Sequence, residues 1–127
     1  ELFQKRVSVA PSEPIADNAA DVFIQRCLKI VEQNMENAEF SVKELGEQLH
    51  LGRATLYRKL MDTTGKSPVE FIRFMRLERS KQLLQNSDLS IAEIAYAVGF
   101  SDPKYFTRVF RDAYQITPSK FQESTNK

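Results

Sequence analysis

Cysteine is nearly absent from this sequence, which has Cys27 as its single thiol. One thiol excludes a disulfide within the chain and suits a reducing compartment, so we expect a cytoplasmic location. The sequence also lacks the run of roughly 18 apolar residues that a membrane span requires, and no segment resembles a signal peptide. These absences predict a segment that makes no contact with a membrane.

Histidine is equally scarce, since His50 is the only one. Without a cluster of cysteines or carboxylates at ligand spacing, the sequence predicts no metal site and no cofactor. The stretch Thr64-Gly65-Lys66-Ser67 matches the end of a phosphate-binding loop, but that loop needs a glycine five residues before Gly65, where Leu60 stands. We therefore expect no enzymatic activity from this chain.

What the sequence does have is apolar bulk and an uneven charge. Its 127 residues are 42% apolar and include nine phenylalanines, enough for one compact region with a modest core. The first 40 residues carry four basic and seven acidic side chains, whereas residues 41–120 carry thirteen basic and nine acidic ones. This basic later part is suggestive of a nucleic-acid partner. Because the chain begins with Glu1 rather than Met, we expect a further domain upstream.

An internal repeat covers much of the basic part. The segments SVKELGEQLHLGRATLYRKL and SIAEIAYAVGFSDPKYFTRVF match at an offset of about 49 residues, which becomes about 50 after the turn in the second copy. Paired positions include Ser41 with Ser90, Glu44 with Glu93, Leu45 with Ile94, Leu49 with Val98, Leu56 with Phe106 and Arg58 with Arg108. The repeat predicts two copies of one structural unit.

Each copy has the pattern of a helix, a turn and a second helix. Ser-x-x-Glu motifs at residues 41–44 and 90–93 are capping boxes, in which a hydroxyl and a carboxylate satisfy backbone donors at a helix start. Gly99 tolerates the left-handed backbone of a turn, and Pro103 favours the first turn of the next helix. His50 stands at the equivalent turn position of the first copy, so we expect that turn to be strained or differently shaped.

The second helix of each copy has an inward and an outward face. In the second copy, the inward stripe is Phe106, Val109, Phe110 and Ala113, and the opposite face carries Lys104, Thr107, Arg108 and Arg111. In the first copy, Leu56 and Leu60 face inward, whereas Ala54, Tyr57, Arg58 and Met61 face outward. Lys59 occupies the position at which Val109 packs, so the first of these helices is less cleanly amphipathic.

The remaining segments predict helices between and around the copies. Ser67-Pro68-x-Glu70 opens a connecting helix that would be roughly 27 Å long. An apolar stripe of Ile24, Cys27, Leu28, Val31 and Met35 predicts an earlier helix, and Thr117-Pro118 begins a last one.

The predicted fold is all-α, with two helix-turn-helix subdomains joined by a long connecting helix and about seven helices in total. We expect a linker over residues 1–17, a domain over 18–124 and a tail over 125–127. Within the domain, the units span about 41–64 and 90–114, and the connecting helix about 67–86.

The duplicated unit, with IAEIAYAVGFSDPKYFTRVF and ITPSKF in the second copy, closely resembles the AraC/XylS family of bacterial transcription regulators over roughly residues 20–124. Within that family, LGRATLYRKL followed by TGKSPVEFIRFMRLERSKQLL is most similar to the C-terminal output domain of hybrid two-component sensor and response-regulator proteins. The resemblance implies sequence-specific binding of double-stranded DNA under the control of an upstream phosphorelay. It also implies an upstream receiver domain, RNA polymerase as a partner, a full-length protein that pairs on DNA, and a place compatible with the cytoplasmic part of a membrane-bound sensor.

The resemblance further implies that the outward residues of the two second helices meet the major groove: Arg53, Ala54, Tyr57 and Arg58 in the first copy, and Lys104, Thr107, Arg108 and Arg111 in the second. Their chemistry agrees, because arginine can donate two bonds to a guanine edge, lysine can reach guanine or phosphate, and alanine or threonine can touch a thymine methyl. Arg73, Arg76 and Arg79 on the connecting helix are interpreted as structural or solvated, and Cys27 as a core residue.

An all-helical protein-interaction module could use the same core and repeat without binding DNA, and this alternative stays open. The outward-facing basic residues favour DNA binding. Because the chain has neither a heptad repeat nor a large exposed apolar surface, we expect this fragment to be monomeric, with pairing supplied upstream. Two units on one connector would address two major-groove segments about one helical turn, roughly 34 Å, apart.

Overall fold

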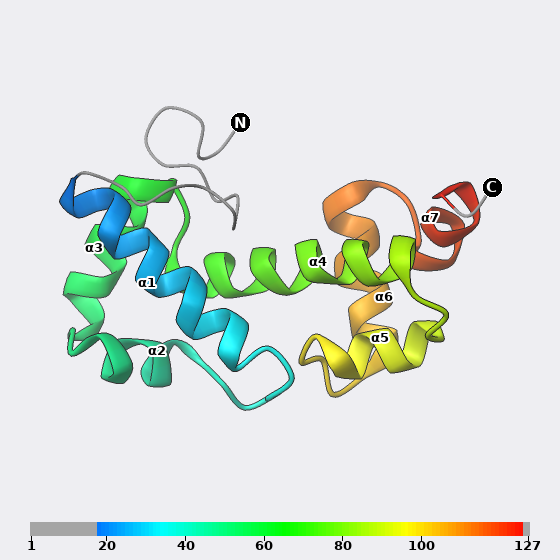
Figure 1. Ribbon diagram of the computed structural model, residues 1–127, viewed down its shortest axis with the longest axis horizontal. Coiled ribbons are helices and arrows are strands. Elements are labelled where there is room, and N and C mark those ends of the chain that lie inside the picture. The colour runs from blue at the N-terminus through cyan, green and yellow to red at the C-terminus, as the bar shows by residue number, and fades with distance from the viewer. Residues whose placement is uncertain (1–17, 126–127) are drawn as a thin grey trace. The chain divides into compact units, whose positions relative to one another are not determined.

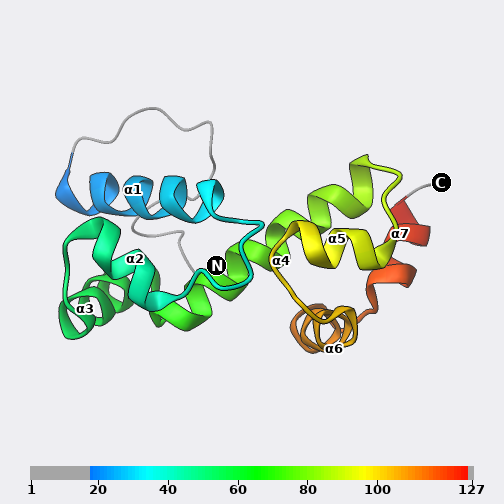
Figure 2. The ribbon, with the colours of Figure 1, turned by 90° about the horizontal axis from the view of Figure 1, so that it is seen from below.

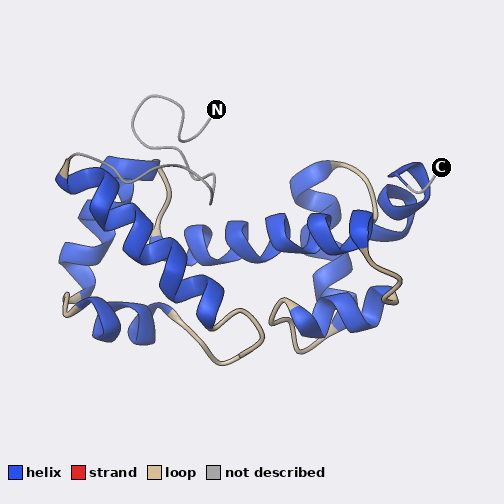
Figure 3. Ribbon diagram, in the orientation of Figure 1, coloured by secondary structure: helices blue, strands red, loops and turns tan. Residues whose placement is uncertain are grey.

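A computed structural model describes residues 18–125, so the expected linker over residues 1–17 and the last two residues of the tail lie outside the described part. The described residues form seven helices and no strand, which confirms the all-α fold class (Figures 1 and 3). The helices are α1 (Ala19–Gln33), α2 (Val42–Leu49), α3 (Arg53–Thr64), α4 (Pro68–Asn86), α5 (Ile91–Ala97), α6 (Pro103–Tyr114) and α7 (Pro118–Thr125).

The chain divides into two units. The first comprises residues 18–34 and 40–73 of the described part, and the second comprises Met35–Glu39 and residues 74–125. One helix-turn-helix, α2 with α3, therefore lies in the first unit, and the other, α5 with α6, lies in the second. The helix α4 passes from the first unit into the second after Arg73.

The core of the first unit forms where α1 packs against α2 and α3, three helices that Figure 2 shows together. Its buried residues include Ile24, Cys27, Leu28 and Val31 from α1, Leu45 and Leu49 from α2, and Leu56 and Leu60 from α3. The predicted stripe on α1 is thus confirmed except at Met35. Because α1 ends at Gln33 and Asn34 caps it, Met35 lies beyond the helix and belongs to the second unit.

The core of the second unit is a cluster of buried side chains from α4, α5, α6 and the turn before α6: Leu77, Leu84, Ile94, Ala95, Val98, Phe100, Phe106, Val109 and Phe110. The predicted inward stripe of α6 is correct for its first three members but wrong for Ala113, which is exposed. Instead, the half-buried Tyr114 packs against the cluster, with its ring centroid 4.7 Å from that of Phe110. The position four residues after Phe110 stays on the same helix face, and tyrosine has the longer reach.

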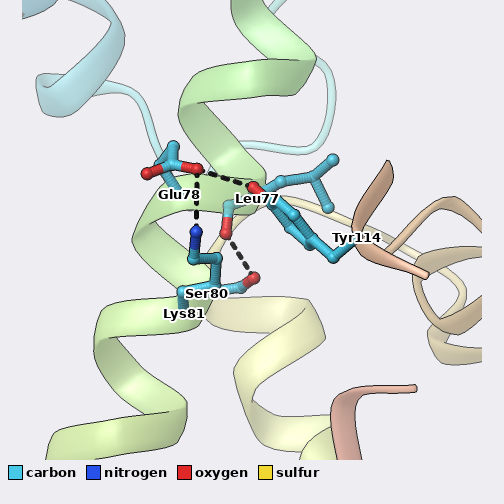
Figure 4. A network of polar contacts seen from close by, with 5 residues as sticks. All are labelled: Leu77, Glu78, Ser80, Lys81 and Tyr114. Atoms are coloured by element: carbon cyan, nitrogen blue, oxygen red, sulfur yellow. Dashed lines mark hydrogen bonds and ion pairs between the residues drawn. The ribbon is translucent and has the colours of Figure 1, made fainter. Parts of the chain in front are cut away.

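Polar contacts join Tyr114 to α4 within the second unit (Figure 4). The Tyr114 hydroxyl donates a 2.8 Å hydrogen bond to Glu78 Oε2, and Lys81 Nζ lies 3.3 Å from the same oxygen. Burial of the ring, together with the bond to this carboxylate, raises the pKa of Tyr114. The Lys81 ammonium also lies 4.4 Å from the centroid of the Tyr114 ring. The last turn of α6 is therefore fixed to α4 by a charge-assisted hydrogen bond and by a cation–ring contact.

The turn between helices has the same hydrogen-bond pattern in both copies. In each, the residue after the left-handed position donates to a carbonyl five residues earlier, at 2.9 Å, as in a Schellman motif. The left-handed position is His50 in the first copy, with φ of 59°, and Gly99 in the second, with φ of 92°. Of the two expectations for the first turn, backbone strain at His50 is therefore the one that the structure supports.

Gly99 meets a second constraint, because a buried arginine fills the space beside it. A Cβ added at Gly99 would lie 1.2 Å from Arg76 Nη1 and 2.5 Å from the Met35 carbonyl oxygen. The Arg76 guanidinium donates to the carbonyls of Met35, Val98 and Asn37 at 2.8, 2.7 and 3.0 Å. Burial lowers the pKa of Arg76. Arg76 is therefore structural, since it ties the loop after α1 to the turn after α5 within the second unit.

Capping boxes begin three of the helices. At the start of α4, Ser67 N–H donates to Glu70 Oε1 at 2.9 Å, and Glu70 N–H donates to Ser67 Oγ at 3.2 Å. The box at residues 90–93 has the same pair of bonds, and Ser41 N–H donates to Glu44 Oε1 at 2.9 Å. The pKa values of the Glu44 and Glu70 carboxyls are held below their usual range, chiefly by the hydrogen bond with the Ser41 hydroxyl for Glu44 and by that with the Ser67 backbone for Glu70.

The connecting helix α4 is the longest of the described helices, with 19 residues. It contributes Phe71 and Ile72 to the core residues of the first unit, and Leu77 and Leu84 to those of the second. At 1.5 Å per residue it is about 28 Å long. None of the helices in the described range combines the length and apolar character needed to cross a membrane.

Candidate nucleic-acid interface

The outward face of α6 carries the four residues predicted for the second copy. Lys104, Arg108 and Arg111 are exposed and Thr107 is half-buried, at the i, i+3, i+4, i+7 spacing of one helix face. Phe106 and Phe110 hold the opposite face in the core, and both are fully buried. The helix start is ordered by Asp102, whose Oδ1 accepts the Lys104 N–H at 3.0 Å. The second unit thus presents a cationic helix face on a rigidly packed helix.

The outward face of α3 carries the four residues predicted for the first copy. Arg53, Ala54, Tyr57 and Arg58 are all exposed, and 52% of the Tyr57 surface is open to solvent. The same helix buries Leu56 and Leu60, as predicted, but Met61 is half-buried and not fully outward. Gly52 precedes α3 as its N-cap and, having no side chain, supplies no capping hydrogen bond to the first N–H groups of this helix.

Lys59 explains how α3 packs despite its weaker amphipathic pattern. The side chain stands at the position equivalent to the buried Val109, yet it is exposed. Its ammonium lies 5.2 Å from the centroid of the Phe23 ring on α1. A cation above an aromatic face is attracted by the ring, so Lys59 covers the edge of the first unit's core while keeping its charge in water.

The charges on these two faces are not neutralised by carboxylates of the described residues. Within the described part of the chain, none of the five candidate cations forms an ion pair; they are Arg53, Arg58, Lys104, Arg108 and Arg111. By contrast, Lys43 pairs with Glu47 at 3.6 Å, and Lys81 pairs with Glu78 at 3.3 Å. Unpaired surface cations on a helix of groove-fitting size are suited to a polyanion.

One aromatic residue on α6 was not anticipated from the sequence. Tyr105 is 37% exposed, and its ring centroid lies 5.1 Å from the central carbon of the Arg108 guanidinium. The spacing of three residues between them is a signal that could have suggested this contact, because such residues are neighbours on a helix surface.

The other residues considered as candidates in the sequence, Cys27 and the phosphate-loop-like segment, contribute to the packing and the helix ends of the first unit. Cys27 is buried in the first unit, and burial raises the pKa of its thiol to about 12, so the thiolate is disfavoured. The phosphate-loop-like segment ends α3: Thr64 Oγ1 donates to the Leu60 carbonyl at 2.7 Å, and Gly65 caps the helix with φ of 75°. Among the described residues, no group of three or more histidine, cysteine or carboxylate side chains could hold a metal ion.

Comparison with known proteins shows the same architecture elsewhere. The model of a family described as helix-turn-helix domain matches residues 45–124. The chain is 37% identical over 120 residues to histidine kinase P4 of Formosa agariphila, and the match covers 94% of this chain but 9% of that protein. The C-terminal domain of the two-component response regulator yesN from Fusobacterium nucleatum superposes with a TM-score of 0.74 at 29% identity, covering 80% of this chain and 99% of that domain. The DNA-binding domain of AdpA, a global transcriptional factor solved in complex with a target DNA, has a TM-score of 0.72 at 23% identity, covering 77% of this chain and 87% of that one.

These matches define the class of protein. The chain belongs to the helix-turn-helix domain family, which matches well over half of its length. More narrowly, it is an AraC-type domain similar to the C-terminal domains of response regulators, as the resemblance of its sequence implied. The match to histidine kinase P4 spans 9% of that protein's length.

Proposed function

We propose that this chain binds double-stranded DNA sequence-specifically, as the output domain of a bacterial transcription regulator. One observation carries the proposal: each of the two helix-turn-helix units exposes, on its second helix, a cationic face that has no carboxylate partner among residues 18–125. A helix fits the major groove of B-DNA, and the second helix is the one that such units place there. Membership in the AraC-type family supports the proposal, and a domain of the same fold was solved on its target DNA.

The eight outward residues have distinct roles in this proposal. Arg58 and Arg108, which occupy equivalent positions of the repeat, read base edges, because an arginine fork can donate two bonds to guanine. Arg53, Lys104 and Arg111 contact phosphate or guanine. Ala54 and Thr107 approach thymine methyl groups, and Tyr57 contributes an exposed ring and hydroxyl.

Control by phosphorylation completes the proposal. The names of two similar proteins, a histidine kinase and a two-component response regulator, support a receiver domain upstream of this segment. Phosphorylation there would pair two chains on DNA, and the bound pair would engage RNA polymerase. The segment by itself is then a monomer located in the cytoplasm.

A charge-matched pair of double variants tests the proposed interface. We would select bound sequences from random DNA and then titrate the selected duplex and a scrambled duplex. The variant Arg58→Ala with Arg108→Ala should lose most of its preference for the selected duplex. The control, Arg73→Ala with Arg79→Ala, removes the same charge from exposed positions on α4 and should retain that preference. Absence of DNA binding at low salt would instead support the all-helical protein-interaction module.

A further inference from the structure

The guanidinium of Arg108 rests above a ring at the protein surface. Its central carbon lies 5.1 Å from the Tyr105 ring centroid, within the range at which a cation is attracted to an aromatic face. Arg108 makes no hydrogen bond or ion pair with another described residue. The ring therefore restrains the position of the side chain while its N–H donors stay open to an external acceptor.

The Tyr105 ring is itself connected to the core of the second unit. Its centroid lies 6.0 Å from that of Phe100, which is 7% exposed. Phe100 in turn lies 5.2 Å from the fully buried Phe106. A series of tilted rings thus runs from the core to the surface and ends beneath the arginine. Such ring pairs favour defined relative orientations.

The first unit lacks this support. In the repeat alignment, Thr55 occupies the position of Tyr105, and Arg58 the position of Arg108. No aromatic ring lies under Arg58 among the described residues, whereas Lys59, Lys81 and Arg108 each lie above one. The two equivalent arginines are therefore held differently.

We propose that Tyr105 is a positioning residue, which holds the Arg108 guanidinium ready for the DNA and makes the second unit the more discriminating of the two. This inference rests on the proposed function. An arginine side chain has several rotatable bonds, and ordering them on binding opposes affinity. A ring that orders the side chain in the free protein removes part of that cost. Arg58, without a ring, adapts to its half of the DNA with weaker base preference.

Variants at residue 105 and a double-mutant cycle with Arg108 test this role. Tyr105→Leu removes the ring, Tyr105→Phe keeps it, and Tyr105→Thr copies the first unit. On the selected duplex, Leu and Thr should each weaken binding about fivefold, as expected for loss of a cation–π contact, and Phe should stay within about twofold. In an Arg108→Ala background, Tyr105→Leu should have no further effect. Tyr96→Leu, at another exposed tyrosine of the second unit, is the matched control and should bind as the unchanged chain does.

A measurement without DNA separates positioning from general packing. Side-chain protons of Arg108 should show an upfield ring-current shift in the NMR spectrum of the free chain, which Tyr105→Phe keeps and Tyr105→Thr removes. Circular dichroism melting identifies any variant that fails to fold. If Tyr105→Leu does not fold, Tyr105→Thr takes its place in the double-mutant cycle. The proposal is overturned if the folded variants without the ring bind DNA normally. It is also overturned if loss of the ring weakens DNA binding as much in the Arg108→Ala chain as in the unchanged chain. Failure of the unchanged chain to prefer the selected duplex would refute the proposed function itself, while the ring-current shift would persist.

Discussion

Arg108 carries the sharpest expectation for a single side chain. Replacing Arg108 by alanine should cost about 1–3 kcal/mol of binding free energy on the selected duplex and relax the preference at one base pair. The fold should survive, because Arg108 is exposed while Phe106 and Phe110 on the same helix are fully buried. Titration of the selected duplex and of duplexes with single base-pair changes measures both effects.

A phosphate contact by Arg108 would give a different result. Selected and scrambled duplexes would then weaken alike, and the slope of binding against salt would fall by about one. Arg79→Ala is the control for charge alone, since Arg79 is exposed on α4 and donates to Gln82 at 2.9 Å. It should leave the base preference unchanged.

Gly99 and His50 occupy equivalent left-handed positions but should respond oppositely to substitution. Gly99→Ala places a Cβ against Arg76 and against a backbone carbonyl, so we expect a loss of several kcal/mol in the free energy of unfolding. His50→Gly removes backbone strain and should raise that free energy by up to about 1 kcal/mol. Urea denaturation measures both. Changes of equal size in the free energy of unfolding at the two positions would contradict the role given to Arg76.

At the scale of helices, the capping carboxylates should make stability depend on acid. The folded-state pKa of Glu70 is lowered, so its contribution is present above the unfolded pKa, near 4.3, and is lost as the pH falls through the folded pKa. Glu70→Gln should therefore lower the melting temperature at pH 7 and narrow the difference between pH 7 and pH 3. Glu36→Gln, at an exposed glutamate outside the capping boxes, is the control. An unchanged pH profile in Glu70→Gln would show that the charge of this carboxylate does not contribute, since glutamine can still accept the capping hydrogen bond.

The sequence predicted helices well where local chemistry decides them. The Ser-x-x-Glu boxes marked the starts of α2, α4 and α5, and apolar spacing predicted the buried faces of α3 and α6. It was wrong near helix ends. Met35 continues the spacing of α1 although the helix has already ended, and Ala113 fits the stripe of α6 although Tyr114 fills the place. Periodicity alone does not show which of two adjacent residues reaches the core.

The candidate interface was predictable only in part. The exposure of both outward faces follows from the repeat, whereas their contact with DNA stays a prediction. The burial of Arg76 could not be foreseen, because its carbonyl partners lie 22 to 41 residues away in sequence. Long-range contacts of this kind leave no local pattern. The contact of Arg108 with Tyr105 is different, because their spacing of three residues on one helix could have suggested it.

For the whole molecule, we expect a monomer that binds weakly until two copies are joined. A tandem of two chains on a flexible linker should bind a doubled site more tightly than one chain binds a single site, by a factor of about 100 or more, through effective concentration. Sedimentation of the single chain at micromolar concentration checks the starting state. A stable dimer there would contradict the assignment of pairing to an upstream domain.

The central claim is that both helix-turn-helix units read DNA, and spacing tests it most directly. Binding of the chain is measured by titration on its selected duplex and on versions with inserts between the two half-boxes, which are the DNA segments that the two units contact. Five inserted base pairs rotate one half-box by about half a turn and should abolish high-affinity binding. Ten inserted base pairs return the half-box to the same face of the duplex but move it by about 34 Å along the axis. This displacement is more than the roughly 28 Å length of α4, so the ten-base-pair insertion should not rescue binding. Unchanged affinity on both inserted duplexes would contradict the claim and show that one unit alone, with α6 the first candidate, reads the DNA.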